Sequence, residues 1–304
     1  MRKSVALTIT LFLLFGIFAE SVYQFVDTLD EDKKDFSFFK LNKDPKYAHV
    51  YEMGLSLCDK DAPFGSEYRG IQGALTFGCC AALFYLSTVL SHREILEGRV
   101  TQFTGEGQYD PYEKGFVYIE TGSFLGLSSH VVAAGLKYAA SPGLIYCHDL
   151  WDDGTNVTSL GDDGQSSIWD SDLLYDKGAP SRFARFYSNV IREQLQHFII
   201  PIQGNSLVTL RIHPSESAHL IFVDGSHTFE NVYQDLVESW RILKPGGILL
   251  GHDCLPASQE LMTMEEADQK RGVRKAVKKF CSERGLKWQI VDFTMYMFRI
   301  EKIR

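Results

Sequence analysis

The stretch FVDGSHTFENVYQDL (222–236), followed by LKPGGILLGHDC (243–254), decides the fold of this chain. In both, an apolar run typical of a buried strand ends in ionisable residues: Asp-Gly-Ser-His (224–227) in the first and His-Asp (252–253) in the second. Acids and histidines at the tips of buried strands cost free energy unless something binds there. The two stretches therefore indicate a buried sheet whose strand ends form a binding site.

Outward from this stretch, apolar runs alternate with amphipathic segments from about residue 112 onward. The pattern predicts strands at 115–122, 143–151, 197–206, 218–227 and 246–254, and helices at 127–140, 181–195, 230–243 and 272–285. Ser128 is the expected N-cap of the first of these helices. Two further strands, 288–293 and 295–302, follow each other directly, which favours an antiparallel end. The alternation predicts an α/β fold with a doubly wound, mostly parallel seven-stranded sheet.

Composition excludes some classes of partner. The 304 residues carry a formal net charge of −8 and a sequence pI of about 5.6, which argues against nucleic acid as a partner. The six cysteines form no C-x-x-C pair and no zinc-type spacing. A disulfide framework is therefore not indicated.

The N-terminal residues have the pattern of a targeting signal. The residues MRKS precede a 15-residue apolar run at 5–19, and AES (19–21) offers small residues for cleavage. This pattern predicts that 1–21 is a signal peptide or a signal anchor, so that the protein is lumenal, membrane-anchored or secreted. Asn156, in the sequon NVT, is consistent with a glycoprotein of the secretory pathway.

Residues 22–105 are expected to form a stalk and a helical extension in front of the main domain at 106–304. The first part, 22–65, is charged and irregular. The run GALTFGCCAALFYLSTVL (73–90) has two readings, a membrane span or a helix buried against the main domain. We favour the buried helix because Gly, Thr and Ser interrupt the apolar run.

Polar residues also follow the other predicted strands. Ligands of open α/β sheets bind beyond the carboxyl ends of the strands. After the first strand, Glu120 leads a turn in which Gly122 and Gly126 allow close backbone approach to a ligand, and an acid there suits a ligand that carries an amine. The spacing differs from G-x-G-x-x-G, which argues against a nicotinamide-dependent oxidoreductase. Asp149, after the second strand, suits either the two hydroxyls of a ribose or the capping of a loop.

The order of these motifs resembles a known family. E-x-G-x-x-x-G-x-S, D-L-W, G-N-S, V-D-G-S-H-x-x-E-x-V-x-x-D and L-K-P-G-G-x-x-x-x-H-D follow one another as in class I S-adenosylmethionine-dependent methyltransferases. The resemblance is greatest to the branch of metal-dependent sugar O-methyltransferases and cephalosporin hydroxylase-like proteins. It covers about residues 112–302, and the last two motifs are its most specific part.

The resemblance implies a role for each matching residue. It implies a cofactor site for S-adenosylmethionine made by Glu120, Gly122, Ser123, Gly126, Asp149, Asn205 and Ser206. It also implies a divalent ion, Mg²⁺ or Mn²⁺, at Asp224, His252 and Asp253. His227 stands where that branch has its general base.

His252 departs from what a hard ion prefers, because imidazole suits Mn²⁺, Fe²⁺ or Zn²⁺ better than Mg²⁺. Three alternatives stay open: the metal is a softer one, His252 supports Asp224 and Asp253 from behind, or no metal binds and the histidine and acid form a structural hydrogen bond. We assign no chemical role to His213 and His219.

The sequence thus predicts an S-adenosylmethionine-dependent O-methyltransferase that acts on a small-molecule or glycan acceptor, with a hydroxyl of a sugar or glycan as the expected methyl acceptor. A catalytically silent, membrane-tethered binding protein with the same fold is the main rival, and a nucleotide-dependent oxidoreductase is a second. The methyl acceptor and the oligomeric state are left open by the sequence.

Overall fold

The computed structural model describes residues 47–57, 66–73, 75, 77–101, 115–151, 174–176, 179–254, 264–292 and 296–303. The predicted signal segment 1–21, most of the predicted stalk 22–65 and the sequon at Asn156 lie outside these residues. None of the helices in the described part has the length and apolar character that a membrane crossing needs.

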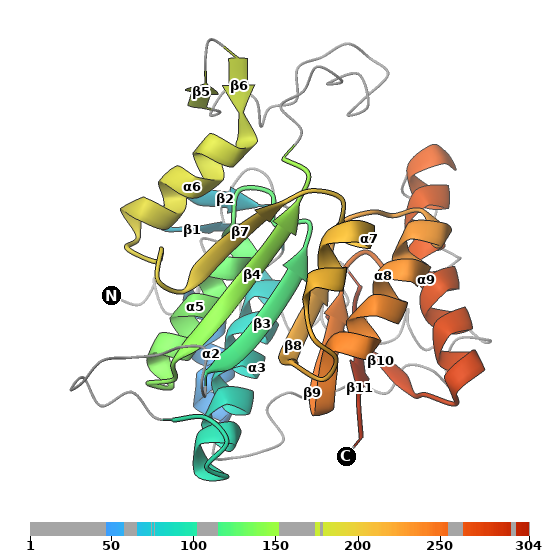
Figure 1. Ribbon diagram of the computed structural model, residues 1–304, viewed down its shortest axis with the longest axis horizontal. Coiled ribbons are helices and arrows are strands. Elements are labelled where there is room, and N and C mark those ends of the chain that lie inside the picture. Colours follow the sequence, from blue (N-terminus) through green and yellow to red (C-terminus); the bar gives the residue numbers. More distant parts are fainter. Residues whose placement is uncertain are drawn as a thin grey trace, which may run out of the picture. The chain divides into compact units, whose positions relative to one another are not determined.

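Seven strands of the described residues form one sheet in the order β10-β11-β9-β8-β3-β4-β7 (Figure 1). Their bounds are β3 Phe116–Thr121, β4 Gly143–Asp149, β7 Ile199–Gln203, β8 Ala218–Val223, β9 Leu243–Gly251, β10 Trp288–Asp292 and β11 Met297–Glu301. The five strands from β7 to β9 are parallel, and β11 is antiparallel to both β9 and β10. The predicted mostly parallel sheet with an antiparallel end is confirmed.

The order of the strands reverses between β3 and β8. The chain runs from β3 to β4 and β7 on one side of this point, and then returns to build β8 and β9 on the other. A crevice opens at such a reversal because the loops after the two central strands lead away in opposite directions. The carboxyl ends of β3 and β8 are therefore the expected place for a ligand.

Helices cover both faces of the sheet. Figure 1 shows α2, α3 and α5 behind the sheet and α8 and α9 on its other side. The helix bounds are α2 Ala48–Leu57, α3 Phe77–Leu96, α5 Leu127–Tyr138, α6 Arg182–Arg192, α7 Ser206–Thr209, α8 Phe229–Ile242 and α9 Met264–Arg284. Two short hairpins, β1 Ser66–Tyr68 with β2 Ile71–Gly73 and β5 Leu174–Asp176 with β6 Ala179–Ser181, and a 3₁₀ turn, η4 Leu210–Ile212, complete the described elements.

The apolar run at 73–90 lies mostly in α3, and this helix is buried. Cys79, Cys80 and Leu83 are inaccessible to solvent and belong to the hydrophobic core. On α5, a Cβ added to Gly135 would lie 2.1 Å from Ser87 Oγ, so the two helices pack at very short range. The buried-helix alternative is confirmed, and Ser87 and Thr88, two of the residues that interrupt the run, lie at this helix contact.

The predicted N-cap of α5 is wrong. The helix begins at Leu127 after Gly126, whose φ of 93° is left-handed, and no side chain caps it. Glycine adopts such a φ at little cost, whereas serine does not. Ser128 instead lies buried in the first turn of the helix.

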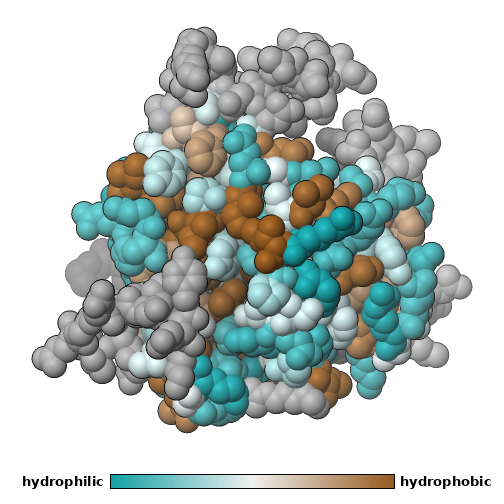
Figure 2. All heavy atoms as spheres, viewed as in Figure 1, coloured by the Kyte–Doolittle hydropathy of each residue, from teal (hydrophilic) through white to brown (hydrophobic). Residues whose placement is uncertain are grey.

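β7 forms one edge of the sheet and pairs only with β4 among the described strands. Three of its five residues are half-buried. On the face of the molecule that is in view, Figure 2 shows hydrophobic residues gathered near the middle, between more hydrophilic regions. A hydrophobic core cluster lies on the opposite side of the sheet, where α3 and α5 pack.

Candidate active site

A cavity of about 300 Å³ opens beyond the carboxyl ends of β3, β4 and β7. It thus lies beside the point where the strand order reverses, as the fold leads one to expect. The residues that line it are Thr121, Gly122, His148, Asp149, Leu150, Gly204, Asn205, Ser206, Leu207, Gly225, Ser226 and Asn231. Four of the seven predicted cofactor residues are among them: Gly122, Asp149, Asn205 and Ser206.

Gly122 joins this cavity to the tip of β8. Its φ is 82°, and an added Cβ would lie 2.0 Å from the backbone oxygen of Asp224. The Gly122 N–H donates to the carbonyl of His148 at 2.8 Å, and the Asp224 N–H donates to that of Thr121 at 2.9 Å. No other residue type fits this position without displacing the loop that carries Asp224.

The remaining three predicted cofactor residues, Glu120, Ser123 and Gly126, are not among the residues that line the cavity. Glu120 is fully buried, and its Oε2 accepts a hydrogen bond from the Tyr118 hydroxyl at 2.8 Å. Burial raises the pKa of Glu120, although the nearby Ser128 and Ser123 hydroxyls favour its charged form. Ser123 is also buried, and Gly126 packs against the ring of Phe186 on α6.

Asp149 both caps a loop and lines the cavity. Its Oδ2 accepts from the Phe124 N–H at 2.8 Å, and its Oδ1 accepts from the Trp151 N–H at 2.7 Å. The indole N–H of Trp151 donates in turn to the Phe124 carbonyl at 2.7 Å. Burial raises the pKa of Asp149, while these two backbone donors lower it. Each carboxylate oxygen keeps a second lone pair with which to accept a hydroxyl.

Asn205 and Ser206 form the opposite wall at the start of α7. Asn205 is the N-cap, and its Oδ1 accepts from the Leu207 N–H at 2.9 Å. Behind Ser206 lies Asp235 of α8, which is inaccessible to solvent. Burial raises the pKa of Asp235 to about 6, and its contact with the Ser206 hydroxyl opposes that shift.

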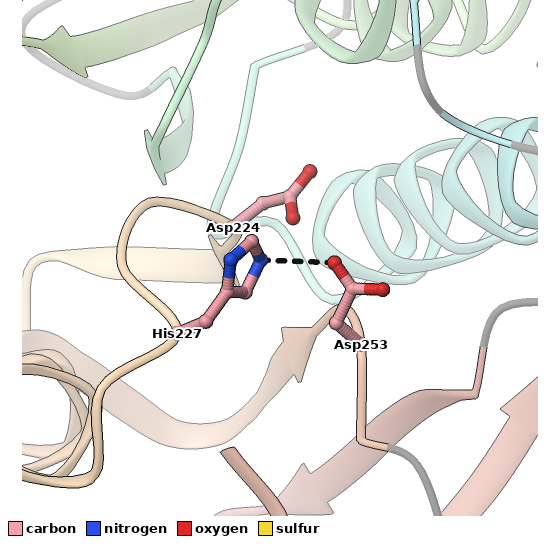
Figure 3. Close-up of side chains that lie close together, drawn as sticks. All are labelled: Asp224, His227 and Asp253. Carbon is pink, nitrogen blue, oxygen red and sulfur yellow. Dashed lines mark ion pairs between the residues drawn. The ribbon is translucent and has the colours of Figure 1, made fainter. Parts of the chain in front are cut away.

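Two carboxylates and an imidazole converge next to the cavity (Figure 3). Asp224 and His227 follow β8, and Asp253 follows β9. His227 Nε2 lies 2.9 Å from Asp253 Oδ2, and one potential ligand atom from each of the three residues lies within 4.8 Å of the others. Asp253 has a φ of 56°, a strained conformation for a residue with a side chain, and such strain is frequent at functional sites.

His252 lies beneath these carboxylates. Its side chain is 2% exposed, and its Nδ1 is 3.3 Å from both Asp224 Oδ1 and Asp253 Oδ2. Burial by itself lowers the pKa of His252, but the two carboxylates outweigh it and raise the pKa well above its usual value. A protonated His252 offsets part of the negative charge of the two acids. The three described residues whose ligand atoms lie close enough to share an ion are therefore Asp224, His227 and Asp253. The sequence predicted Asp224, His252 and Asp253.

Several lining residues were not found from the sequence. Ser226 stands inside the Asp-Gly-Ser-His motif, so its position after the strand was a usable signal. Asn231, in the first turn of α8, donates from Nδ2 to Ser226 Oγ at 3.2 Å. A lone asparagine in a helix carries no motif, and only the packing of α8 beside the strand tips brings it to the cavity.

The sheet order, the antiparallel β11 and the glycine turn at the cavity define the class I methyltransferase fold. Residues 119–254 match a family model described as a methyltransferase domain. Residues 119–254 therefore form a methyltransferase domain, and its sheet has the class I strand order. Among curated proteins, no sequence matches the chain.

Solved structures with similar folds are distant in sequence. The O-methyltransferase NovP is 12% identical, with 78% of this chain and 85% of that chain covered and a TM-score of 0.50. An O-methyltransferase from Bacillus cereus in complex with SAH is 14% identical, with 93% and 97% covered and a TM-score of 0.46. Cofactor-bound Rv0187 from MTB is 16% identical, with 93% and 96% covered and a TM-score of 0.49.

Proposed function

We propose that this protein transfers the methyl group of S-adenosylmethionine to a hydroxyl of a sugar or glycan, with help from a divalent ion. The observation that carries the proposal is the contact between Gly122 and Asp224. It joins the wall of the cavity to the cluster of Asp224, His227 and Asp253. A methyl donor in the cavity and a hydroxyl at the cluster would therefore be neighbours, and proximity of this kind lowers a reaction barrier.

The residues present fit the cofactor. Gly122 lines the cavity, and as a glycine it places no side chain there. Asp149 offers carboxylate lone pairs for ribose hydroxyls, and Asn205 and Ser206 offer polar groups on the facing wall. When bound, S-adenosylmethionine supplies an electrophilic methyl group on its sulfonium.

The cluster also fits a hard divalent ion such as Mg²⁺ or Mn²⁺. Asp224 and Asp253 provide the carboxylate oxygens that such ions prefer. An ion there would make a nearby hydroxyl more acidic. His252 then serves to hold the two carboxylates in position from below.

His227 is the residue we assign to the proton. Its side chain is 33% exposed, so that it can reach an acceptor in solution, and Asp253 lies against its Nε2. Histidine is the side chain whose usual pKa is closest to neutrality, which suits a general base. In this assignment His227 removes the hydroxyl proton while the two carboxylates hold the ion.

The choice of a sugar acceptor rests on the resemblance of the strand-tip motifs to metal-dependent sugar O-methyltransferases. The proposed location in the secretory pathway rests on the charge and hydropathy of residues 1–21. Glycans are the abundant hydroxyl-rich acceptors that these two inferences share.

The proposal is tested with the full-length protein by calorimetric titration with S-adenosylhomocysteine, in EDTA and then with Mg²⁺ or Mn²⁺. Micromolar binding is expected, followed by transfer of labelled methyl groups from S-adenosylmethionine to a panel of sugars and glycans. Binding without transfer to any acceptor would favour the silent binding protein instead. Absence of binding under every metal condition would refute the proposed cofactor.

A further inference from the structure

A second cavity lies at the other end of the sheet, away from the methyltransferase site. It has a volume of about 440 Å³ and is built around the starts of β8 and β9 and the end of α3. Its lining residues are Leu90, Arg93, Glu94, Arg99, Glu216, His219, Lys244, Pro245, Gly246 and Gly247. Two arginines, a lysine and a histidine therefore face one space, which no step of methyl transfer uses.

The ring of His219 is fixed in one orientation and one tautomer. It stacks on Phe116 with ring centroids 4.7 Å apart, and its Nδ1 accepts a hydrogen bond from the Val117 N–H at 2.9 Å. Burial lowers the pKa of His219 to about 3, so the ring is neutral near pH 7. Because a backbone N–H can only donate, Nδ1 carries no proton, and the ring proton is on Nε2.

The Nε2–H of His219 points at another donor. Lys244 Nζ lies 2.9 Å from His219 Nε2, and an ammonium group has no lone pair with which to accept. Two arrangements avoid this clash of donors. Either Lys244 is a neutral amine that accepts from the His219 Nε2–H, or an anion accepts hydrogen bonds from both side chains. Burial lowers the pKa of Lys244, Glu94 raises it and Arg99 lowers it further, and a bound anion would favour the charged form of the lysine.

The surrounding charges favour an anion. Glu94 is buried and forms an ion pair with Arg99. Its Oε1 also lies 3.4 Å from Arg93 Nε. Arg93 also donates from a terminal nitrogen to the Gly246 carbonyl at 2.7 Å, which holds its guanidinium at the cavity wall. The lining contains three cations, Arg93, Arg99 and Lys244, against two carboxylates, Glu94 and Glu216. Arg99 also pairs with Glu97, and Glu216 pairs with Lys302, so that among these described groups Lys244 is the cation left over.

We propose that this cavity binds the phosphate group of a small molecule, with its oxygens accepting from the Lys244 ammonium and the His219 Nε2–H. Arg93 forms the cationic wall behind the phosphate. A volume of about 440 Å³ lies in the range of small-molecule sites and leaves room for an organic part beside the phosphate. Inorganic phosphate shares the same chemistry and is the simplest probe.

The test is calorimetric titration of the full-length protein with inorganic phosphate at pH 7. Binding is expected in wild type, and Lys244→Met is expected to weaken it at least tenfold. Lys275→Met, at an exposed position on α9, is the matched control and keeps wild-type affinity. Unchanged S-adenosylhomocysteine binding in Lys244→Met establishes that the variant is folded. Equal affinity of the two variants, or no phosphate binding in wild type, overturns the proposal.

A measurement without substitution covers the case in which Lys244→Met does not fold. In ¹⁵N-histidine NMR spectra, His219 is expected to show a protonated Nε2 whose signal moves when phosphate is added. A signal that does not move contradicts the site. Repeating the titration with phenyl phosphate distinguishes an organic phosphate from inorganic phosphate as the ligand. Tighter binding than that of inorganic phosphate supports an organic phosphate, and weaker binding rejects the organic part of the proposal.

Discussion

Asp253 Oδ2 lies 2.9 Å from His227 Nε2, although the two residues follow different strands of the sheet. β8 and β9 are parallel neighbours, so their carboxyl ends meet at one edge. The pair joins the two motifs that end in acids and histidines, and it gives the imidazole a fixed orientation beside two carboxylates. Mutation of His227 tests the chemical role of this pair.

His227→Asn is expected to lower methyl transfer by about 10²- to 10⁴-fold, the usual contribution of a general base. Metal affinity should fall much less, because Asp224 and Asp253 remain. The measurement is the rate of transfer together with a Mn²⁺ titration of the same protein. His197→Asn, at an exposed position, is the control. Loss of metal binding in parallel with activity would instead make His227 a ligand.

Asp149→Ala is expected to weaken S-adenosylhomocysteine binding by tenfold or more. It also removes the acceptor for the N–H groups of Phe124 and Trp151, and each buried donor left unpaired costs about 1–3 kcal/mol. Calorimetry and thermal unfolding measure the two effects. Glu230→Gln, on the exposed start of α8, should change neither. Wild-type affinity in Asp149→Ala would show that this acid only caps its loop.

Gly122→Ala is expected to lower the free energy of unfolding by more than the cost of a left-handed φ alone. The new Cβ would meet the backbone of Asp224, so the loop beyond β8 must move. Gly98→Ala is the matched control, since Gly98 has a φ of 70° and nothing within 4 Å of an added Cβ. Denaturant unfolding measures the loss in unfolding free energy of both variants. A loss of about 1–3 kcal/mol is expected for Gly98→Ala, where only the left-handed φ is unfavourable. Equal losses would show that the contact is unimportant.

The stability of the protein is expected to fall as the pH drops from 6.5 towards 4, partly because of two buried histidines. His148 Nε2 lies 2.8 Å from His213 Nε2, and burial lowers the pKa of His148 to about 3 and that of His213 to about 4. In this range the unfolded chain binds protons that the folded protein does not, so stability is complete above the unfolded pKa and declines below it.

His213→Gln removes one of these groups from the proton balance. Between pH 6 and pH 4, the slope of its unfolding free energy against pH should be shallower than that of wild type by up to about 1.4 kcal/mol per pH unit. Denaturant unfolding at several pH values measures the slope. Parallel curves for the two proteins would contradict a neutral His213 in the folded state.

The sequence predicted the strands and most of the helices because their signal is local. The near-continuous apolar runs of β3, β4 and β8 reflect burial on both faces, and turn residues mark where each run ends. The start of α5 was missed for a local reason too. Gly126 adopts a left-handed φ, which outweighed the capping preference of Ser128.

The chain by itself determined that acids and histidines stand at the tips of parallel strands, since parallel strands end at one edge. Only the tertiary structure decided which of them meet. Glu120 lies buried within β3, whereas Gly122, the residue after the end of the strand, packs against the backbone of Asp224 beyond β8. The same geometry brings His227 to Asp253 and places His252 beneath both acids. Distances between residues far apart in the chain depend on packing, which local sequence patterns do not encode.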